Sequence, residues 1–390
     1  MSIKGLTNEQ AAMVQHIKLL KQQAGSHSPS LFTIKEQLPS LKMDIDACFL
    51  SNPYATDLFL NYFKKELLGD DLHIRDMLEF YPSQNKVIAA SLASFLKVPQ
   101  EMLFVGNGAI EIIQAVIHNF TKEKIIVNIP TFSSYYEFIK PGVSIVFNKL
   151  KKEEDYKLNV EDLLQLVNYE KPDTVVLINP NNPNGGYITK AEIAELLEGL
   201  KNIKTVLLDE SFIHFAYEND ELEPLSYVDM VMKYPNVITI KSMSKDFGIA
   251  GIRAGYAIMH PSRIKHLLEN GFLWNSNGLA EYFFKLYVRE QFQKEYEIVR
   301  KRYIRDSQEY FKNLAAIEGI KRYPTQANFA LIELETGILA DDFAFGLLVK
   351  SGVYTRTCSD KIGLDGEFIR LASRSHDENE AIVKAIKEAL

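Results

Sequence analysis

The chain has 390 residues, of which 46% are apolar and 24% charged, and its net charge is −7 at neutral pH. This length suffices for two domains, and the acidic balance argues against a nucleic-acid-binding protein, which normally carries a basic face. No run of 18 apolar residues and no apolar signal-peptide core occurs, so we expect no membrane span and a cytoplasmic location. Only Cys48 and Cys358 are present, which argues against a disulfide framework.

The first 120 residues begin with a helical pattern and then change to alternating helices and strands. Residues 1–25 have apolar positions at helical spacing, and the segment A-G-S-H-S-P-S at residues 24–30 ends that pattern. Further along, the sequence predicts a helix over residues 87–96, a strand over 102–105 and a helix over 110–120.

The central part of the chain alternates short β-branched runs with helical segments. Strands are predicted at residues 125–129, 144–147, 174–178, 205–209 and 237–240, and helices at 160–168 and 190–200. This alternation predicts an α/β fold with a mostly parallel, doubly wound sheet. Ligands of such sheets bind at the carboxyl ends of the strands.

The chain becomes more helical after residue 276. A long helix is predicted over residues 281–314, with strands at 328–334 and 368–372. We therefore expect a large α/β domain over residues 60–275. A smaller α+β domain would combine residues 1–59 with residues 276–390.

The run K-S-M-S-K-D-F-G-I-A-G-I-R-A-G-Y, residues 241–256, directly follows the predicted strand at 237–240. It holds more chemistry than a turn requires, since a turn needs only one or two glycines. Ser242, Ser244 and Arg253 could surround a phosphate, because arginine binds phosphate bidentately. Lys245 would lie in an enclosed site, where desolvation lowers the pKa of an amine and makes it a usable nucleophile.

Polar residues also follow other predicted strands. G-N-G-A at residues 106–109 opens a helix whose free N–H groups favour phosphate, although such turns often only connect elements. N-P-N-N-P-N-G at residues 179–185 could by itself be a simple turn. Asp209 ends an apolar strand, where a buried carboxylate needs a cationic partner; a helix cap is the alternative. Together these groups describe a site for pyridoxal phosphate, an aldehyde with a phosphate tail and a basic ring nitrogen.

The lysine run resembles the motif of fold type I pyridoxal-phosphate enzymes of the class I/II aminotransferase family. The resemblance covers roughly residues 45–390, with the motifs in family order, and is strongest to threonine-phosphate decarboxylases and histidinol-phosphate aminotransferases. It implies that Lys245 forms the Schiff base with the cofactor and that Asp209 meets the ring nitrogen. Ser242, Ser244 and Arg253 would hold the cofactor phosphate.

The resemblance assigns four more residues to the cofactor. Gly108 and Ala109 would supply phosphate-binding backbone. Tyr135 of P-T-F-S-S-Y would stack on the pyridine ring. Asn182, which precedes Pro183, would hydrogen-bond the ring hydroxyl.

Four residues are assigned to the neighbouring subunit or to the substrate. Tyr54 of S-N-P-Y resembles a tyrosine that reaches the cofactor phosphate of the neighbouring subunit, which implies a homodimer with shared active sites. Arg370 of F-I-R-L-A matches the arginine that binds the substrate carboxylate. Arg356 of R-T-C matches a substrate-phosphate arginine of the decarboxylases. His27 of S-H-S-P is a further candidate for contact with the substrate.

Two features favour decarboxylation over transamination. Phe212 of D-E-S-F stands where histidinol-phosphate aminotransferases usually have tyrosine, and residues 355–380 and 273–280 resemble threonine-phosphate decarboxylases. S-N-P-Y and the S-K pair depart from the decarboxylases of cobamide synthesis, which favours a different substrate such as O-phosphoserine. We expect a decarboxylase of O-phospho-L-serine or O-phospho-L-threonine that yields a phosphoamine. The alternative is an aminotransferase of the histidinol-phosphate type.

Other classes of protein fit less well. G-N-G-A-I-E lacks the third glycine of the dinucleotide-binding motif. The histidines show no metal-ligand spacing, so we expect no metal site.

Overall fold

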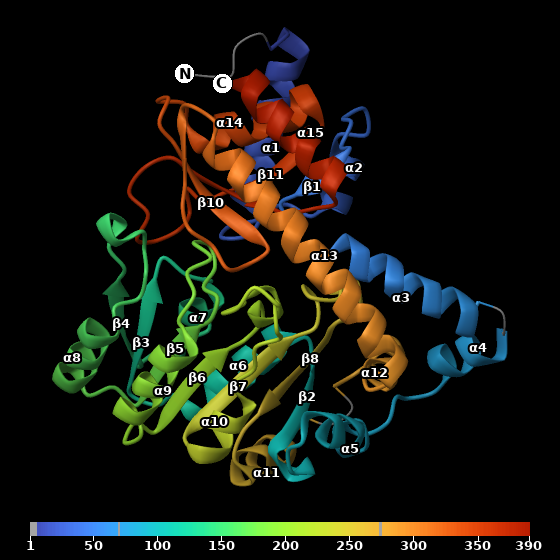
Figure 1. Cartoon of the computed structure of the whole chain (residues 1–390), viewed down its shortest axis with the longest axis vertical. Coiled ribbons are helices and arrows are strands. Elements are labelled where there is room, and N and C mark those ends of the chain that lie inside the picture. The colour runs from blue at the N-terminus through green and yellow to red at the C-terminus, as the bar shows by residue number, and fades with distance from the viewer. Residues whose placement is uncertain (1–5, 69–70, 273–274) are drawn as a thin grey trace.

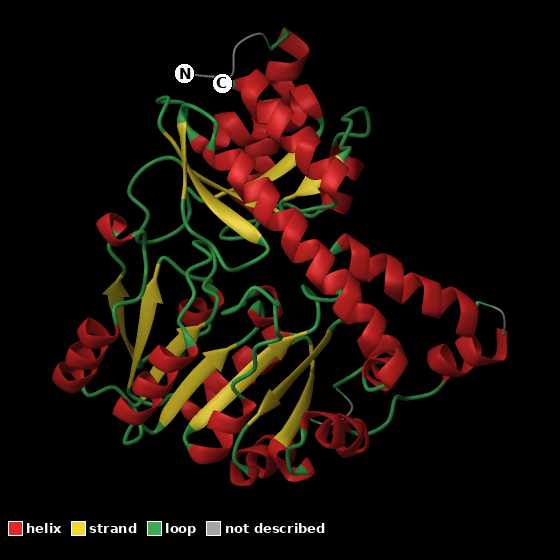
Figure 2. Ribbon diagram, viewed as in Figure 1, coloured by secondary structure: helices red, strands yellow, loops and turns green. Residues whose placement is uncertain are grey.

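The computed structural model describes residues 6–68, 71–272 and 275–390, so Trp274 of the 273–280 segment lies outside the described residues. Two sheets, each with its own helices, lie one above the other (Figures 1 and 2). The helices of the N-terminal part are α1 (Asn8–Gln23), α2 (Leu31–Gln37), α3 (Pro53–Glu66), α4 (Asp71–Glu79), α5 (Asn85–Leu96) and α6 (Ala109–Phe120). Those that follow are α7 (Ser134–Glu137), α8 (Val160–Glu170), α9 (Lys190–Gly199), α10 (Val228–Lys233), α11 (Pro261–Glu269), α12 (Gly278–Tyr287), α13 (Glu290–Ala315), α14 (Ala340–Ser351) and α15 (His376–Ala389).

The larger sheet has seven strands in the order β2-β8-β7-β6-β5-β3-β4. They are β2 (Leu103–Asn107), β3 (Lys124–Ile129), β4 (Ser144–Lys149), β5 (Thr174–Ile178), β6 (Thr205–Asp209), β7 (Val237–Ser242) and β8 (Ala254–Ile258). β8 runs antiparallel to both of its neighbours, and the other pairs are parallel. This sheet confirms the predicted α/β fold class.

The central strands are apolar along their whole length because helices cover both faces of the sheet. Successive residues of a strand point to opposite faces. Val206 and Leu208 of β6 accordingly pack into a core shared with α5, α8, α9 and α12, whereas Leu207 packs into a core shared with α6 and α11. This explains why the sequence shows continuous apolar runs here instead of alternation.

The smaller sheet has five strands in the order β1-β11-β12-β10-β9. They are β1 (Ile45–Ala47), β9 (Ile320–Arg322), β10 (Phe329–Leu334), β11 (Val353–Thr357) and β12 (Phe368–Ala372). Its core includes residues of α1, α14, α15 and the C-terminal part of α13, so the first and the last helix of the described chain both pack on this sheet (Figure 1).

The prediction of one long helix over residues 281–314 is wrong, because the structure has two helices there, α12 and α13. Val288 is the C-terminal cap of α12, and Arg289 has the extended backbone of an N-terminal cap (φ −78°, ψ 130°). Neither glycine nor proline marks this break. The predicted domain limit between residues 59 and 60 falls inside α3, and the division into domains stays a prediction.

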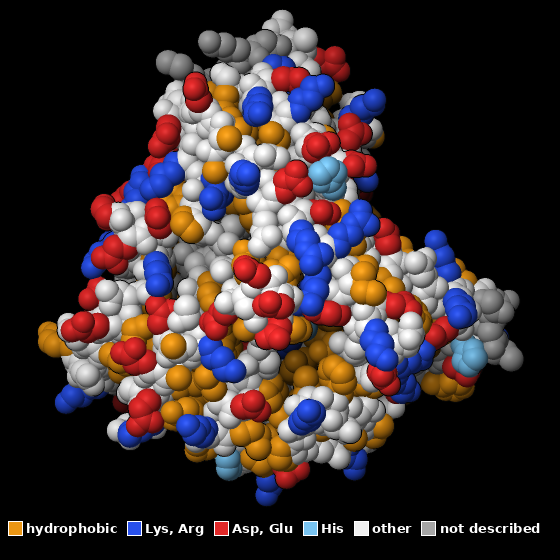
Figure 3. Space-filling model, in the orientation of Figure 1, with side chains coloured by type: hydrophobic (Ala, Val, Ile, Leu, Met, Phe, Trp, Pro, Cys, Tyr) orange, Lys and Arg blue, Asp and Glu red, His pale blue; other side chains and the backbone are white. Residues whose placement is uncertain are grey.

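Two further features concern the surface and the helices. Figure 3 shows basic and acidic side chains interspersed over the visible face. Within the described part of the chain, no helix is both long enough and apolar enough to cross a bilayer.

Candidate active site

A cavity of about 370 Å³ lies where the carboxyl ends of the large-sheet strands face the smaller sheet. Three parts of the chain build its wall: strand ends of the large sheet, residues 26–28 and 48–50 of the N-terminal part, and the smaller sheet with its loops. The lining residues that the sequence predicted are Ala109, Asn182, Asp209, Ser242, Ser244, Lys245, Arg253, Arg370, Arg356 and His27. The tertiary fold therefore brings ten of the predicted residues to one place.

One end of the cavity is suited to a phosphate. Gly108 is the N-terminal cap of α6, and the first N–H groups of this helix lack partners within it. Gly108 has φ +79°, and a Cβ there would lie only 2.9 Å from Arg253 Cζ. A Cβ on Gly255 would lie 2.8 Å from the Ala109 nitrogen. The two glycines thus allow a guanidinium and strand β8 to approach the start of α6.

Asp209 is the last residue of β6 and is 4% exposed. Its Oδ1 accepts a hydrogen bond from the Ser211 nitrogen at 2.8 Å, and its Oδ2 accepts one from the Tyr135 hydroxyl at 2.8 Å. Burial raises the pKa of Asp209, while these hydrogen bonds oppose the rise. A cationic ring nitrogen in the cavity would supply the counter-charge that this carboxylate lacks.

The structure places Tyr135 elsewhere than expected. Its side chain has no exposed surface, packs in the core beneath the sheet and is not among the residues that line the cavity. Phe132, three residues earlier in P-T-F-S-S-Y, does line the cavity. The motif therefore offers Phe132 as its aromatic surface, and Tyr135 instead orients Asp209.

Lys245 follows β7 in the turn that leads to Gly248. The loop is fixed from α3, since the Asn52 nitrogen donates to the Lys245 carbonyl at 3.1 Å and Thr56 Oγ1 donates to the Gly248 carbonyl at 2.9 Å. Burial, with Arg370 and Arg253 as further causes, lowers the pKa of Lys245 to about 8. An amine with this pKa is about half neutral at pH 8 and about one-tenth neutral at pH 7.

Asn182 and Arg370 both line the cavity and are hydrogen-bonded to each other. Arg370 donates from Nη1 to Asn182 Oδ1 and from Nη2 to the Cys48 carbonyl, both at 2.7 Å. The Asn182 amide hydrogens therefore remain for a ligand. Arg370 Nε is buried without a hydrogen-bond partner among the described residues, so the guanidinium can still donate to an anion.

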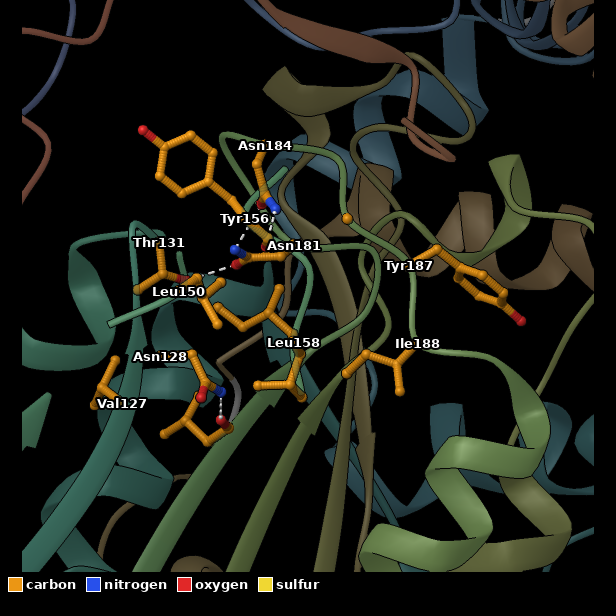
Figure 4. A pocket seen from close by; sticks show the side chains of 13 residues that line it. Val127, Asn128, Thr131, Leu150, Tyr156, Leu158, Asn181, Asn184, Tyr187 and Ile188 are labelled. Atoms are coloured by element: carbon orange, nitrogen blue, oxygen red, sulfur yellow. Dashed lines mark hydrogen bonds between the residues drawn. The ribbon is translucent and has the colours of Figure 1, made fainter. Parts of the chain in front are cut away.

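A hydrogen-bonded network of asparagines holds the loop that carries Asn182 (Figure 4). Thr131 Oγ1 donates to Asn181 Oδ1, and Asn181 Nδ2 donates to Asn184 Oδ1, both at 2.7 Å. Asn184 Nδ2 donates to the Tyr156 carbonyl at 2.9 Å. The loop is thus anchored on both sides of Asn182, so the asparagines of N-P-N-N-P-N-G do more than form a turn.

The other end of the cavity carries a cluster of basic groups around one carboxylate. Arg356 Nη2 donates to both carboxylate oxygens of Asp360, at 2.8 Å each. The same carboxylate lies 3.3 Å from Lys361 Nζ and 3.5 Å from Lys21 Nζ. Arg356 Nη2 also donates to the Ser26 carbonyl at 2.9 Å. Asp341 is a further acid near Lys21, but of this cluster only Arg356 and Lys361 line the cavity, where they can face an anionic ligand.

Tyr54 does not reach the cavity of its own chain. It lies in the first turn of α3, where its hydroxyl donates to Asp306 Oδ2 at 2.6 Å and accepts from the His376 nitrogen at 3.0 Å. Its expected contact with a neighbouring subunit stays a prediction.

Phe132 and Lys361 are lining residues that the sequence did not single out. Phe132 lies in the motif that pointed to Tyr135, and Lys361 lies in the run that contains Arg356. The motifs therefore identified the right segments, but not these two residues within them. Among the described residues, no group of three or more His, Cys, Asp or Glu side chains is placed to hold a metal ion.

The donor set fits pyridoxal phosphate. The start of α6 with Arg253, Ser242 and Ser244 matches its phosphate, and Asp209 matches its ring nitrogen. Lys245 supplies an amine with a lowered pKa.

Comparisons with known proteins find relatives over nearly the whole chain. The family model of aminotransferase class I and II matches residues 50–386. An L-serine phosphate decarboxylase of Campylobacter jejuni is 55% identical over 381 residues, covering 98% of this chain and 97% of that protein. An L-serine phosphate decarboxylase of Sulfurospirillum multivorans is 47% identical over 371 residues, covering 95% and 94%. The solved structure of a decarboxylase from Sulfurospirillum multivorans superposes with a TM-score of 0.94 at 46% identity, covering 98% and 97% of the two chains.

Proposed function

We propose, since the chain belongs to the aminotransferase class I and II family, that it is a pyridoxal-phosphate-dependent decarboxylase of O-phospho-L-serine. The products would be carbon dioxide and ethanolamine phosphate. The observation that carries this proposal is the cavity itself. Its lining includes Lys245 and Asp209, the start of α6 with Arg253, and further cations, among them Arg356 and Lys361, that the cofactor would not need. The relatives at 55% and 47% identity, both named L-serine phosphate decarboxylase, support the decarboxylase over the aminotransferase alternative.

The cofactor would be held by residues from four strand ends. Lys245 would bond covalently to its aldehyde, Asp209 would pair with its ring nitrogen, and Asn182 would donate to its ring hydroxyl. Phe132 would cover one face of its ring. When bound, the cofactor supplies a cationic ring that accepts the electron pair of a bond broken at the substrate α-carbon.

The two anions of phosphoserine would bind to different cations. Arg370 would hold the α-carboxylate through its remaining donor capacity. Arg356 and Lys361, which both line the cavity, would hold the phosphate. Each such charge-assisted hydrogen bond is worth about 1.5–3 kcal/mol. Fixing both ends of the substrate would orient the bond between the α-carbon and its carboxylate.

Lys245 would also return the proton. After carbon dioxide leaves, the α-carbon needs one proton in place of the carboxylate, and Lys245 Nζ, whose pKa is lowered to about 8, is an amine of the cavity that can supply it. Phe212 and Leu50, both buried, would help exclude water from this carbon.

The assembly and location of the protein are also inferred. Tyr54 would contact the cofactor phosphate of a second subunit, which makes a homodimer the expected assembly. A cytoplasmic location suits a reduced chain with two free cysteines.

The test is to incubate the cofactor-loaded protein with O-phosphoserine, O-phosphothreonine or histidinol phosphate. Phosphorus NMR would follow the new phosphoamine, and a carbon dioxide assay would be run with and without a 2-oxo acid. Ethanolamine phosphate formed without any 2-oxo acid supports the proposal. Turnover that requires a 2-oxo acid and releases no carbon dioxide would establish an aminotransferase instead.

A further inference from the structure

A buried ionic network lies behind the lysine loop, on the opposite side of β7 from the cofactor cavity. Ser242 lines that cavity, and the preceding residue, Lys241, points to the other face, as alternation along a strand requires. Lys241 is 1% exposed, and Asp246 and Arg300 are wholly buried. None of the residues that would hold the cofactor belongs to this network.

Lys241 joins the two segments that carry Asp209 and Lys245. Its ammonium forms an ion pair with Asp246, the residue after Lys245, and donates to the carbonyl of Glu210, the residue after Asp209, at 3.0 Å. Asp246 Oδ2 also lies 3.2 Å from His214 Nδ1. One buried ammonium thus fixes the chain directly beyond both functional residues.

Lys241 is the cation in direct contact with Asp246, and Arg300 and Lys245 also favour its ionised form. Burial nevertheless raises the pKa of Asp246 to about 6. Burial, with Lys241 and Arg300 as further causes, lowers the pKa of His214 well below its usual value, so this imidazole is neutral at pH 7. Arg300 donates to Glu297, at 2.7 and 2.9 Å, and to the His214 carbonyl, at 2.7 Å.

The other groups around Asp246 are acids. Burial raises the pKa of Glu210 to about 7, and burial keeps the hydroxyls of Tyr256, Tyr287 and Tyr296 protonated by raising their pKa values. On the cavity side, Arg370 and Arg253 oppose protonation of Lys245, whereas Asp246 and Asp209 favour it. Asp246 thus provides one of two negative charges near the nucleophile.

We propose that Lys241 is a positioning residue that keeps Asp246 ionised behind Lys245 and thereby sets the charge state of the Lys245 amine. A buried carboxylate without a cationic partner takes up a proton. Without Lys241, Asp246 would become neutral and would no longer offset the two arginines. This inference rests on the proposed function only in taking Lys245 as the cofactor-binding amine. That amine must be neutral to bond to the cofactor and protonated to return a proton.

The test uses cofactor-free protein, so that it does not depend on which substrate is decarboxylated. The protein is pulsed with acetic anhydride over a range of pH, and acetylation of Lys245 is followed by mass spectrometry. Lys384, which is 78% exposed, serves as internal reference. The variants are Asp246→Asn, Lys241→Met and the double variant that carries both changes. Urea unfolding of each protein is measured in parallel.

We expect Lys245 to react about threefold to tenfold faster than in the wild type at about pH 6.5 in all three variants, because its charged form has lost a stabilising anion. The single variants should be less stable than the wild type, since Asp246→Asn leaves the Lys241 ammonium buried without its anion and Lys241→Met leaves a buried carboxyl that must take up a proton. The double variant should recover stability but not the wild-type labelling profile.

Two results would overturn the inference. An unchanged profile in the folded double variant would reduce the Lys241–Asp246 pair to a structural role. Slower labelling in Lys241→Met would mean that Asp246 stays ionised without Lys241. If a single variant does not fold, the double variant still decides, because it removes both charges together.

Discussion

The guanidinium of Arg253 lies against the α-carbon of Gly108, so a methyl group at residue 108 would sit 2.9 Å from Arg253 Cζ. Gly108→Ala should therefore displace the arginine that faces the start of α6. We expect the affinity for pyridoxal phosphate to fall by about tenfold or more, because a loss of this size corresponds to the energy of one charge-assisted contact. The measurement is a spectroscopic titration of cofactor-free protein.

Gly142→Ala is the matched control for this change. Gly142 also has a positive φ, +92°, but nothing lies within 4 Å of a Cβ built there. Alanine at residue 142 would therefore cause the same kind of backbone strain as alanine at residue 108, without contacting the site. Equal losses of cofactor affinity in the two variants would mean that strain, and not displacement of Arg253, is responsible.

The roles of Phe132 and Tyr135 can be separated because only one of them lines the cavity. Tyr135→Phe keeps the aromatic ring and removes the hydroxyl that donates to Asp209. It should lower kcat by about tenfold with little change in cofactor affinity, because the carboxylate loses one orienting hydrogen bond. Phe132→Leu should instead weaken cofactor binding. Reversed phenotypes would restore Tyr135 as the stacking residue.

The strand ends could be predicted because helices on both faces make these strands continuously apolar, and a polar residue then marks the end, as Asp209 does. The position of Tyr135 could not be predicted, because the backbone after β3 decides which aromatic of P-T-F-S-S-Y faces the cavity. The break at Val288 had no glycine or proline signal. Asp360 was missed because Lys21, one of its partners, is distant in sequence and meets it only in the folded chain, and because the four-residue spacing from Arg356 does not by itself reveal an ion pair in a loop.

Lys245→Ala should abolish covalent attachment of the cofactor. Reduction of the cofactor-loaded wild type with borohydride should add the mass of the reduced cofactor to the peptide that contains Lys245, and the variant should show no such addition. Lys361→Ala is the control, since Lys361 lines the same cavity but is not placed for this bond by the family resemblance. Cofactor trapped on another lysine in Lys245→Ala would contradict the assignment.

Glu210 should make the cofactor-free protein less stable as the pH rises. Burial raises its pKa in the folded chain from 4.5 to about 7. Between these values the folded state holds a proton that the unfolded state has released, so the contribution of Glu210 is greatest below pH 4.5 and is lost as the pH rises through about 7. Glu210→Gln should remove this loss.

The free energy of unfolding of Glu210→Gln, taken relative to that of the wild type, should be higher at about pH 8 than at about pH 4. The change between the two pH values should be on the order of 1–3 kcal/mol. Urea unfolding at the two pH values gives the comparison. Glu269→Gln, whose side chain is 63% exposed, is the control and should show no such difference. A pH-independent effect of Glu210→Gln would show that Glu210 does not titrate in this range.

Arg356 should determine the preference for a phosphorylated substrate. It lines the cavity, and its Nη2 already donates to Asp360 and to the Ser26 carbonyl, so a substrate phosphate would share or replace these contacts. In Arg356→Ala, the ratio of the affinities for O-phosphoserine and serine should fall by about tenfold or more, because that ratio measures the contact with the phosphate. Spectral titration of the cofactor-loaded protein gives both constants, with Arg322→Ala as a control outside the cavity. An equal decline for both amino acids would mean that Arg356 does not bind the phosphate, and Lys361 would then be the cation left to select it.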